Sequence, residues 1–175
     1  MHAQLRILTA EPKHIASCCA SLSTFLLQKL SDLLPRAPAV TLSIGSGSGV
    51  LEALLLQHEP GLRLEGVEVS ADVNHYLREE SLHVVSYSGA VCARAAEAEA
   101  WMFVYPRSQA LIEEYLRMYG AKDVRVIIFI LPREDVAALT HPLSPLEHDQ
   151  WSGEVVLKAG LADWEAIICY RRTMP

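Results

Sequence analysis

The sequence predicts an α/β protein with a doubly wound, mostly parallel seven-stranded sheet that ends in a C-terminal antiparallel hairpin. Five apolar, β-rich runs alternate with segments that have helical spacing or helix caps, which is the pattern of a parallel sheet covered on both faces. A turn with three glycines, Gly45–Gly49, follows the first of these runs. Two more β-rich runs lie near the C-terminus, joined by a stretch too short for a crossover helix, so we expect them to pair antiparallel.

The first half of the chain supplies the start of this alternation. Residues 15–34 carry apolar side chains at helical spacing, and Pro35 ends that helix. Ser70 is a candidate N-cap for a later helix. The elements that we expect after the leading helix are a strand at 40–44, a helix at 48–58, a strand at 62–69 and a helix at 71–80.

The second half continues in the same way. The run at 124–131 is the most β-rich of the chain and predicts a central buried strand, and Pro132 suits the first turn of a helix. Ser108 is a candidate N-cap. The remaining predicted elements are strands at 83–88 and 100–105, helices at 91–98, 109–119 and 133–139, and hairpin strands at 154–160 and 165–172.

Charge and composition argue against several classes of function. The net charge is −6 and no basic cluster exceeds Arg171–Arg172, so we expect no nucleic-acid partner. No apolar run approaches the ~20 residues of a membrane helix, and the first residues do not form a signal peptide. We therefore expect no membrane association and a cytoplasmic protein. The four cysteines lack metal-ligand spacing, which predicts reduced core thiols and no metal site.

The turn GSGSG at Gly45–Gly49 is the strongest functional signal. Glycines there let the chain turn sharply and approach a ligand, and the following helix offers free N–H groups. A P-loop would need a lysine after the glycines, and none follows. A dinucleotide fingerprint, GxGxxG, would need a glycine where the chain has Val50. This difference of one residue argues against a pyrophosphate ligand.

A carboxylate further along the chain supports the interpretation of the glycine turn as a ligand site. Glu68 ends the second predicted strand, about 20 residues after the glycines, where a carboxylate can accept hydrogen bonds from ribose hydroxyls. The site therefore fits an adenosyl ligand of some kind.

These motifs resemble those of the class I S-adenosylmethionine-dependent methyltransferases. GSGSG resembles their motif I, and GVEVS at 66–70 is close to the family's common GVDIS. The terminal hairpin resembles the last two strands of their seven-stranded sheet. The resemblance implies a Rossmann-like fold, methyl transfer to an acceptor and S-adenosyl-L-methionine as cofactor. It implies cofactor contacts from Gly45, Ser46, Gly47, Ser48, Gly49, Glu68, Val69 and Ser70.

The resemblance is weaker further along the chain. The family often has an acidic residue that meets the adenine amino group, whereas this chain has VVSYSGA, so Tyr87 or Ser88 is expected to serve instead. The fourth predicted strand ends MFVYPRS, at the place of the family's motif IV. There Tyr105 and Arg107 are candidates to line the pocket, with Tyr105 a further cofactor contact. This segment lacks the NPPY and PC signatures of enzymes that methylate nucleic-acid bases.

A general base is needed only where the acceptor must lose a proton early. The candidates are His141 and His148, which lie before the hairpin in the region that overlies the acceptor site in the family. Neither forms a convincing metal-ligand set with its acidic neighbours, so no metal is expected.

We expect one S-adenosylmethionine-binding domain over residues 1–175, comprising a leading helical segment (1–38), a Rossmann-like core (39–150) and the terminal hairpin (151–175). The favoured function is in-line methyl transfer to a small-molecule acceptor. Two alternatives are a non-catalytic relative that acts as a scaffold and an NAD(P)-dependent oxidoreductase. Because only the leading segment could cover the site, a shallow acceptor site, a homodimer that completes the pocket and a loss of catalysis all stay open.

Overall fold

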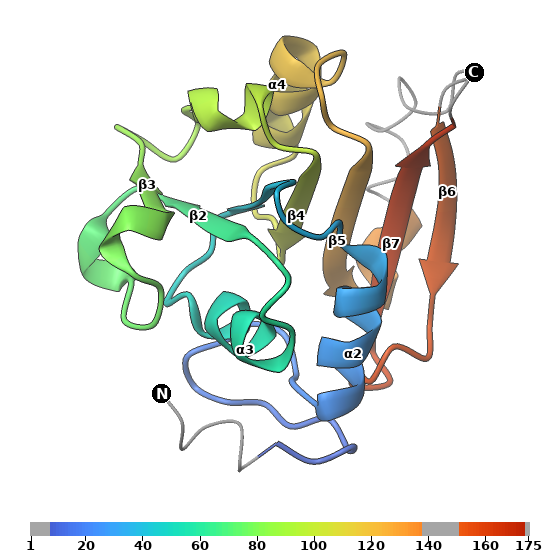
Figure 1. Ribbon diagram of the computed structural model, residues 1–175. Helices are drawn as coiled ribbons and strands as arrows, with labels where there is room; N and C mark the ends of the chain where they lie inside the picture. The colour runs from blue at the N-terminus through green and yellow to red at the C-terminus, as the bar shows by residue number, and fades with distance from the viewer. Residues whose placement is uncertain (1–7, 138–150, 174–175) are drawn as a thin grey trace.

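The computed structural model describes residues 8–137 and 151–173. It contains a mixed seven-stranded sheet with strand order β3-β2-β1-β4-β5-β7-β6 (Figure 1). Each strand from β3 to β5 pairs in parallel with its neighbour, whereas β7 runs antiparallel to both β5 and β6. This confirms the doubly wound sheet and its terminal hairpin. The strands are β1 Thr41–Ile44, β2 Leu64–Glu68, β3 Leu82–Val84, β4 Ala100–Val104, β5 Val126–Pro132, β6 Trp151–Val156 and β7 Glu165–Arg172.

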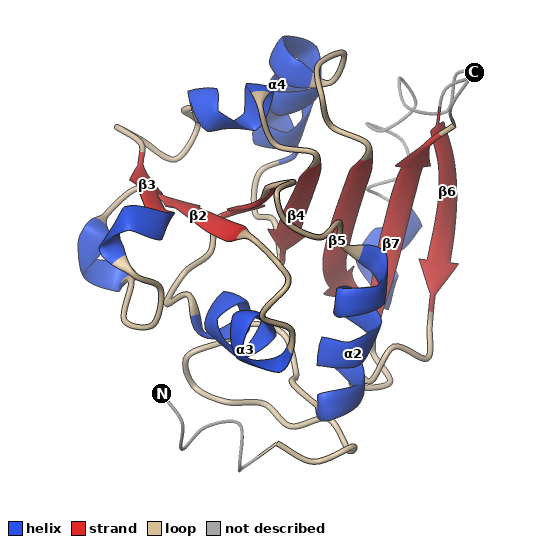
Figure 2. Cartoon of the chain, viewed as in Figure 1, coloured by secondary structure: helices blue, strands red, loops and turns tan. Residues whose placement is uncertain are grey.

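Helices cover both faces of the sheet (Figure 2). On one face, α2 (Thr24–Leu33) and α3 (Val50–His58) pack against alternate residues of the central strands, such as Met102 and Ile128. On the other face, α4 (Gln109–Tyr119) packs against the intervening residues, such as Phe103. Because successive side chains of a strand point to opposite faces, the unbroken apolar run of β5 supplies both cores.

The leading helix is shorter than the sequence predicts. Helix α2 begins at Thr24 rather than near residue 15, because the Ser23 hydroxyl accepts a hydrogen bond from the Leu26 N–H and caps the helix there. The same hydroxyl donates to the Gly160 carbonyl at 2.6 Å, which holds the cap in place from the hairpin loop. Upstream, Lys13 and Leu22 form an antiparallel bridge. The predicted helix over residues 15–23 is therefore wrong.

The predicted helix at 71–80 is also wrong. Ser70 does cap a turn, but only the short 3₁₀ turns Ala71–Val73 and Glu79–Ser81 form. Between them, the Asn74 side chain accepts from the Leu77 N–H and donates to its carbonyl. An asparagine that satisfies the backbone in this way competes with a helix. The N–H groups of residues 75 and 76 instead donate to the Ser48 carbonyl, which joins this loop to the glycine turn.

The third strand and the segment after it are shorter than predicted. Strand β3 covers only residues 82–84, and the expected helix at 91–98 is the single 3₁₀ turn Ala93–Ala96. Two aromatic side chains hold this turn, since the Trp101 indole donates to the Ala95 carbonyl and the Tyr115 hydroxyl accepts from the Cys92 N–H. Downstream, Arg133–Asp135 form another 3₁₀ turn, and the predicted helix at 133–139 ends outside the described residues.

Helix α4 and strand β7 agree with the sequence prediction in their bounds. The Ser108 hydroxyl accepts from the Leu111 N–H and caps α4 as expected. Strand β6 begins at Trp151, earlier than the predicted residue 154. None of the helices in the described part of the chain is long and apolar enough to cross a membrane.

Candidate functional site

A cavity of about 660 Å³ lies at the carboxyl ends of β1, β2 and β4. Ligands of doubly wound sheets bind at this edge, where the strand order reverses and loops from neighbouring strands meet. Here the reversal lies between β1 and β4, because β2 and β3 follow on one side of β1 and β4 and β5 on the other. Gly45 and Gly47 line one side of the cavity, and Glu68 and Ser88 contribute polar groups.

The glycines of the turn have different surroundings. All three have left-handed backbone, with φ of +75° at Gly45, +57° at Gly47 and +75° at Gly49, which other residues rarely adopt. A Cβ added at Gly45 or Gly47 would meet no atom within 4 Å, whereas one at Gly49 would lie 2.9 Å from the Asn74 and Leu77 side chains. Gly49 thus permits close packing, while Gly45 and Gly47 present bare backbone to the cavity.

Glu68 joins the second strand to the glycine turn. One carboxylate oxygen accepts from the Gly47 N–H at 2.7 Å, and the other accepts from the Val69 N–H at 3.1 Å. These bonds hold the carboxylate at the edge of the cavity, beside the bare backbone of Gly47.

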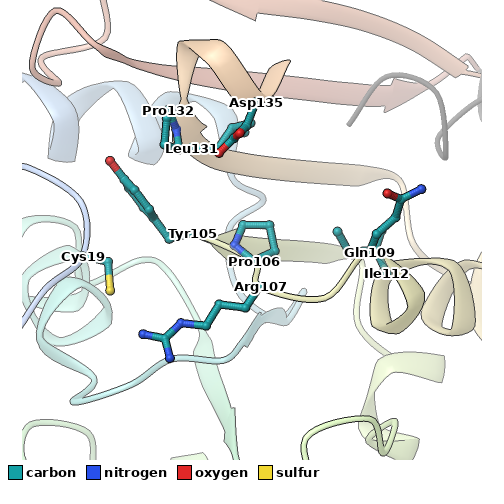
Figure 3. A pocket seen from close by; sticks show the side chains of 9 residues that line it. All are labelled: Cys19, Tyr105, Pro106, Arg107, Gln109, Ile112, Leu131, Pro132 and Asp135. Atoms are coloured by element: carbon teal, nitrogen blue, oxygen red, sulfur yellow. The ribbon is translucent and has the colours of Figure 1, made fainter. Parts of the chain in front are cut away.

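A second cavity, of about 420 Å³, adjoins the first beyond the ends of β4 and β5. The two cavities share Tyr105, Arg107 and Cys19 among their lining residues. Figure 3 shows these three side chains together, with Pro132 and Asp135 lying across from Arg107. The chain thus forms two adjoining cavities, and the residues that follow β4 line both of them.

Tyr105 occupies this junction in a strained conformation. It is the one non-glycine residue in the described part of the chain with positive φ, at +51°, which costs about 1–2 kcal/mol. Two hydrogen bonds hold it: its N–H donates to the Ile130 carbonyl at 2.7 Å, and its hydroxyl donates to Glu165 Oε1 at 2.6 Å. Burial and the neighbouring Glu165 raise the pKa of the Tyr105 phenol, so the hydroxyl stays protonated.

Comparison with known proteins places this architecture. No protein-family model matches the sequence, and no curated protein matches it significantly. Several solved structures, however, match the fold of this chain. The methyltransferase domain of bacterial CtHen1-C is 14% identical, with a TM-score of 0.60 over 83% of this chain and 95% of that chain. A SAM-dependent methyltransferase from Aquifex aeolicus is 12% identical, with a TM-score of 0.60 over 85% and 89%. The chain has the class I methyltransferase fold.

A third structure extends this comparison. The 23S rRNA methyltransferase ErmE is 16% identical, with a TM-score of 0.54 over 85% of this chain and 67% of that chain. These structures share the class I methyltransferase fold with the chain, and at these identities the likeness is one of fold alone.

The structure brings only some of the predicted site residues to the cavity of this fold. Those that line it are Gly45, Gly47, Glu68, Val69, Ser88, Tyr105 and Arg107. Tyr87 is 64% exposed and is not among the lining residues. Ser70 caps its 3₁₀ turn, and Ser48 donates to the Ser17 carbonyl at 2.7 Å.

Two further predicted residues support the glycine turn from outside the cavity. Gly49 packs against the loop at residues 74–77, and the buried Ser46 hydroxyl lies where a Cβ on Gly66 would fall. Both residues therefore shape the turn without lining the cavity. The candidate bases His141 and His148 lie outside the described residues.

Apolar residues complete the 660 Å³ cavity, and the sequence analysis missed them. They lie near the ends of β1, β2 and β4, in the segments that follow β2 and β3, and on α4. A search for residues at the carboxyl end of each predicted strand would have found several of them. They are Ile44, Val67, Val73, Val85, Phe103 and Leu111.

Glu165 is the most consequential residue that sequence reasoning missed. It begins β7 and is fully buried, and its carboxylate accepts from Tyr105, from the Ser21 N–H and hydroxyl, and from the Ala162 N–H. The only available signal was a glutamate at the start of an apolar strand. Its partners lie far away in the sequence, so no local pattern reveals them.

A second buried carboxylate lies beneath the glycine turn. Glu52 on α3 accepts from the Ser43 hydroxyl at 2.6 Å, while its Oε2 has no hydrogen-bond partner in the described part of the chain. Burial raises the pKa of Glu52 to about 7, which the bond from Ser43 only partly offsets. Burial, with Glu52 nearby, also raises the pKa of Cys18 to about 12.

The cysteines correct the expectation that all four are core thiols. All four are free thiols, but Cys19 is exposed rather than part of the core. Within the described residues, no group of three or more His, Cys, Asp or Glu side chains is arranged to hold a metal ion.

Proposed function

We propose that this protein is an S-adenosylmethionine-dependent methyltransferase that acts on a small acceptor. The observation that carries the proposal is the bare backbone of Gly45 and Gly47, which faces a 660 Å³ cavity beside the Glu68 carboxylate. The class I methyltransferase fold of the chain supports it.

The lining residues fit this cofactor. The turn at Gly45–Gly47 would receive the amino-acid end, because its backbone can approach a ligand without side chains in the way. Glu68 would accept hydrogen bonds from the ribose hydroxyls. Val85, Ser88 and Leu111 offer a mostly apolar slot for the adenine. When bound, the cofactor supplies an electrophilic methyl group on a good leaving group.

The adjoining cavity is the proposed acceptor site. Its volume of about 420 Å³ admits a small molecule, and it meets the first cavity at Tyr105 and Arg107. Methyl transfer gains much of its rate when nucleophile and methyl group are held in line. Two adjoining cavities that share Tyr105 and Arg107 would favour that arrangement.

Two features favour a small acceptor over RNA, although the comparison includes an rRNA methyltransferase. The net charge of −6 gives no basic stripe for a phosphate backbone. Apolar groups such as Ile112, Leu131 and Pro132 line the second cavity. The setting that we propose is the cytoplasm, where free thiols such as Cys19 persist.

Isothermal titration calorimetry with S-adenosylmethionine, S-adenosylhomocysteine and NAD tests the proposal. We expect both adenosyl ligands to bind and NAD not to bind. Glu68→Ala is expected to weaken S-adenosylmethionine binding by about tenfold, the equivalent of 1.4 kcal/mol. The matched control is Glu80→Ala, at an exposed position away from the cavity.

Each negative binding result favours one of the two alternative functions. Binding of NAD with no binding of the adenosyl ligands would establish the oxidoreductase alternative. Absence of any adenosyl ligand binding, in a protein that unfolds cooperatively, would favour the scaffold.

A further inference from the structure

Tyr105 is placed to touch molecules in both cavities. It follows β4 directly, is half-buried, and lines the cofactor-sized cavity and the adjoining one. Its positive φ is unusual for a tyrosine, and such strain persists where surrounding structure enforces it, often at functional sites. In Figure 3 its ring reaches from the end of β4 toward the space between Cys19 and Pro132.

The tyrosine hydroxyl is bonded to a carboxylate that has no cationic partner. Glu165 is fully buried, and within the described residues no lysine, arginine or histidine side chain pairs with its carboxylate. Arg133 comes near but donates to the Glu165 backbone carbonyl. The Tyr105 hydroxyl therefore donates directly to a carboxylate oxygen that no cation shares within the described residues.

The walls of the second cavity indicate what the acceptor looks like. Pro106, Ile112, Leu131 and Pro132 are apolar, and the polar groups Arg107, Gln109 and Asp135 lie among them. An apolar ring of modest size fits such walls. The Tyr105 oxygen, whose own proton is committed to Glu165, can accept a hydrogen bond from a hydroxyl on that ring.

We propose that Tyr105 and Glu165 form a proton relay, and that the acceptor is an apolar molecule with a weakly acidic hydroxyl, of the phenol class. This inference rests on the function proposed above and names the substrate class of that site. Tyr105 is the catalytic residue, since it touches the acceptor. Glu165 is a positioning residue that also receives the proton through Tyr105.

The step balances without a further reactant. The acceptor oxygen forms a bond to the methyl carbon as the bond from sulfur to that carbon breaks, and the electron pair stays on sulfur. The acceptor proton passes to the Tyr105 oxygen while the Tyr105 proton passes to Glu165 Oε1, 2.6 Å away. After the product leaves, the proton returns through Tyr105 to solvent.

The relay needs only a modest base. The N–H and hydroxyl groups of Ser21 and the N–H of Ala162 donate to the Glu165 carboxylate and hold it beside Tyr105. The acceptor hydroxyl becomes much more acidic as its oxygen bonds to carbon, so the proton can leave late in the step. A weak, pre-positioned base suffices for such a transfer.

A series of para-substituted phenols tests the relay. Para-nitrophenol is largely ionised at pH 8 and needs no base, whereas phenol and para-cresol keep their protons. With S-adenosylmethionine as donor and methyl ethers measured by mass spectrometry, Tyr105→Phe is expected to lower kcat/KM for phenol and para-cresol about a hundredfold. We expect it to change the value for para-nitrophenol less than about tenfold, because the ring that lines the cavity remains.

Glu165→Gln is expected to show the same dependence on phenol acidity, since an amide accepts the Tyr105 bond but takes up no proton. Where that variant loses stability, Tyr105→Phe decides alone, because it removes one oxygen only. Tyr119→Phe on α4 is the matched control and is expected to behave like the wild type.

The outcomes separate the two proposals. An equal effect of Tyr105→Phe on all phenols would overturn the relay, because a structural role does not depend on acceptor acidity. Normal S-adenosylmethionine binding with no transfer to any phenol would overturn the acceptor class. If the wild-type protein does not bind S-adenosylmethionine, the proposed function itself is overturned.

Discussion

Among single residues, the three glycines of the turn differ in what their missing side chains make room for. Gly45 and Gly47 face open space, whereas Gly49 lies against Asn74 and Leu77. The same substitution is therefore expected to impair binding at one position and stability at another.

Gly47→Val is expected to weaken S-adenosylmethionine binding by at least about tenfold, because a branched side chain would occupy the space beside Glu68. The left-handed backbone adds strain of about 1–2 kcal/mol, so the melting temperature should fall while unfolding stays cooperative. Calorimetry and thermal denaturation measure the two effects. Gly61→Ala, away from the cavity, controls for loss of a glycine. Unchanged affinity in Gly47→Val would show that the cofactor binds elsewhere.

Among elements, the two serine-capped helices differ in how their caps connect to the rest of the fold. Ser108 caps α4 with one bond to the Leu111 N–H, and it is only partly buried. Ser23 caps α2, is fully buried, and also donates to the Gly160 carbonyl of the hairpin loop.

Ser108→Ala is expected to lower the free energy of unfolding by about 1 kcal/mol. Ser23→Ala is expected to lower it by about 2–3 kcal/mol, because it also leaves the Gly160 carbonyl without its donor. Urea denaturation of both variants at the same pH measures the difference. Equal losses would mean that the bond to Gly160 adds nothing to stability.

For the whole molecule, two buried carboxyl groups set opposite limits on stability as pH changes. The guanidinium of Arg94, with His83, lowers the pKa of Glu65 to about 2, so its stabilising contribution is present above pH ~4.5 and is lost as pH falls through ~2. The pKa of Glu52 is raised to about 7, so the folded state holds that proton more tightly than the unfolded state. Its contribution is present below pH ~4.5 and is lost as pH rises through ~7.

The free energy of unfolding is therefore expected to peak near pH ~4.5–5 and to fall toward neutral pH, with a Glu52 contribution on the order of 3 kcal/mol. Urea denaturation across pH 4–8 checks the profile. Glu52→Gln keeps an acceptor for Ser43 and should flatten the fall above pH ~5. A variant that keeps the wild-type slope would assign the pH dependence to another group.

Much of the fold could be predicted because its signals are local. The alternation of apolar runs with capped segments located β1, β4, β5 and β7, and the Ser108 cap located α4. Prediction failed where a side chain forms hydrogen bonds to the backbone that compete with a longer helix. Asn74 closed its own loop instead of allowing a helix, and Ser23 capped α2 well after the first apolar residues of the predicted helix.

By itself, the sequence determined the order of the strands along the chain, the terminal hairpin and the glycine turn with Glu68 near the next strand end. Strand periodicity, capping and the freedom of glycine act over a few neighbouring residues, so one sequence shows them. Only the tertiary structure decided that Tyr105 meets Glu165, 60 residues away, and that Ser21 meets the same carboxylate from 144 residues away. Packing of distant segments sets those contacts, because burial requires each polar group to find a partner wherever the chain brings one.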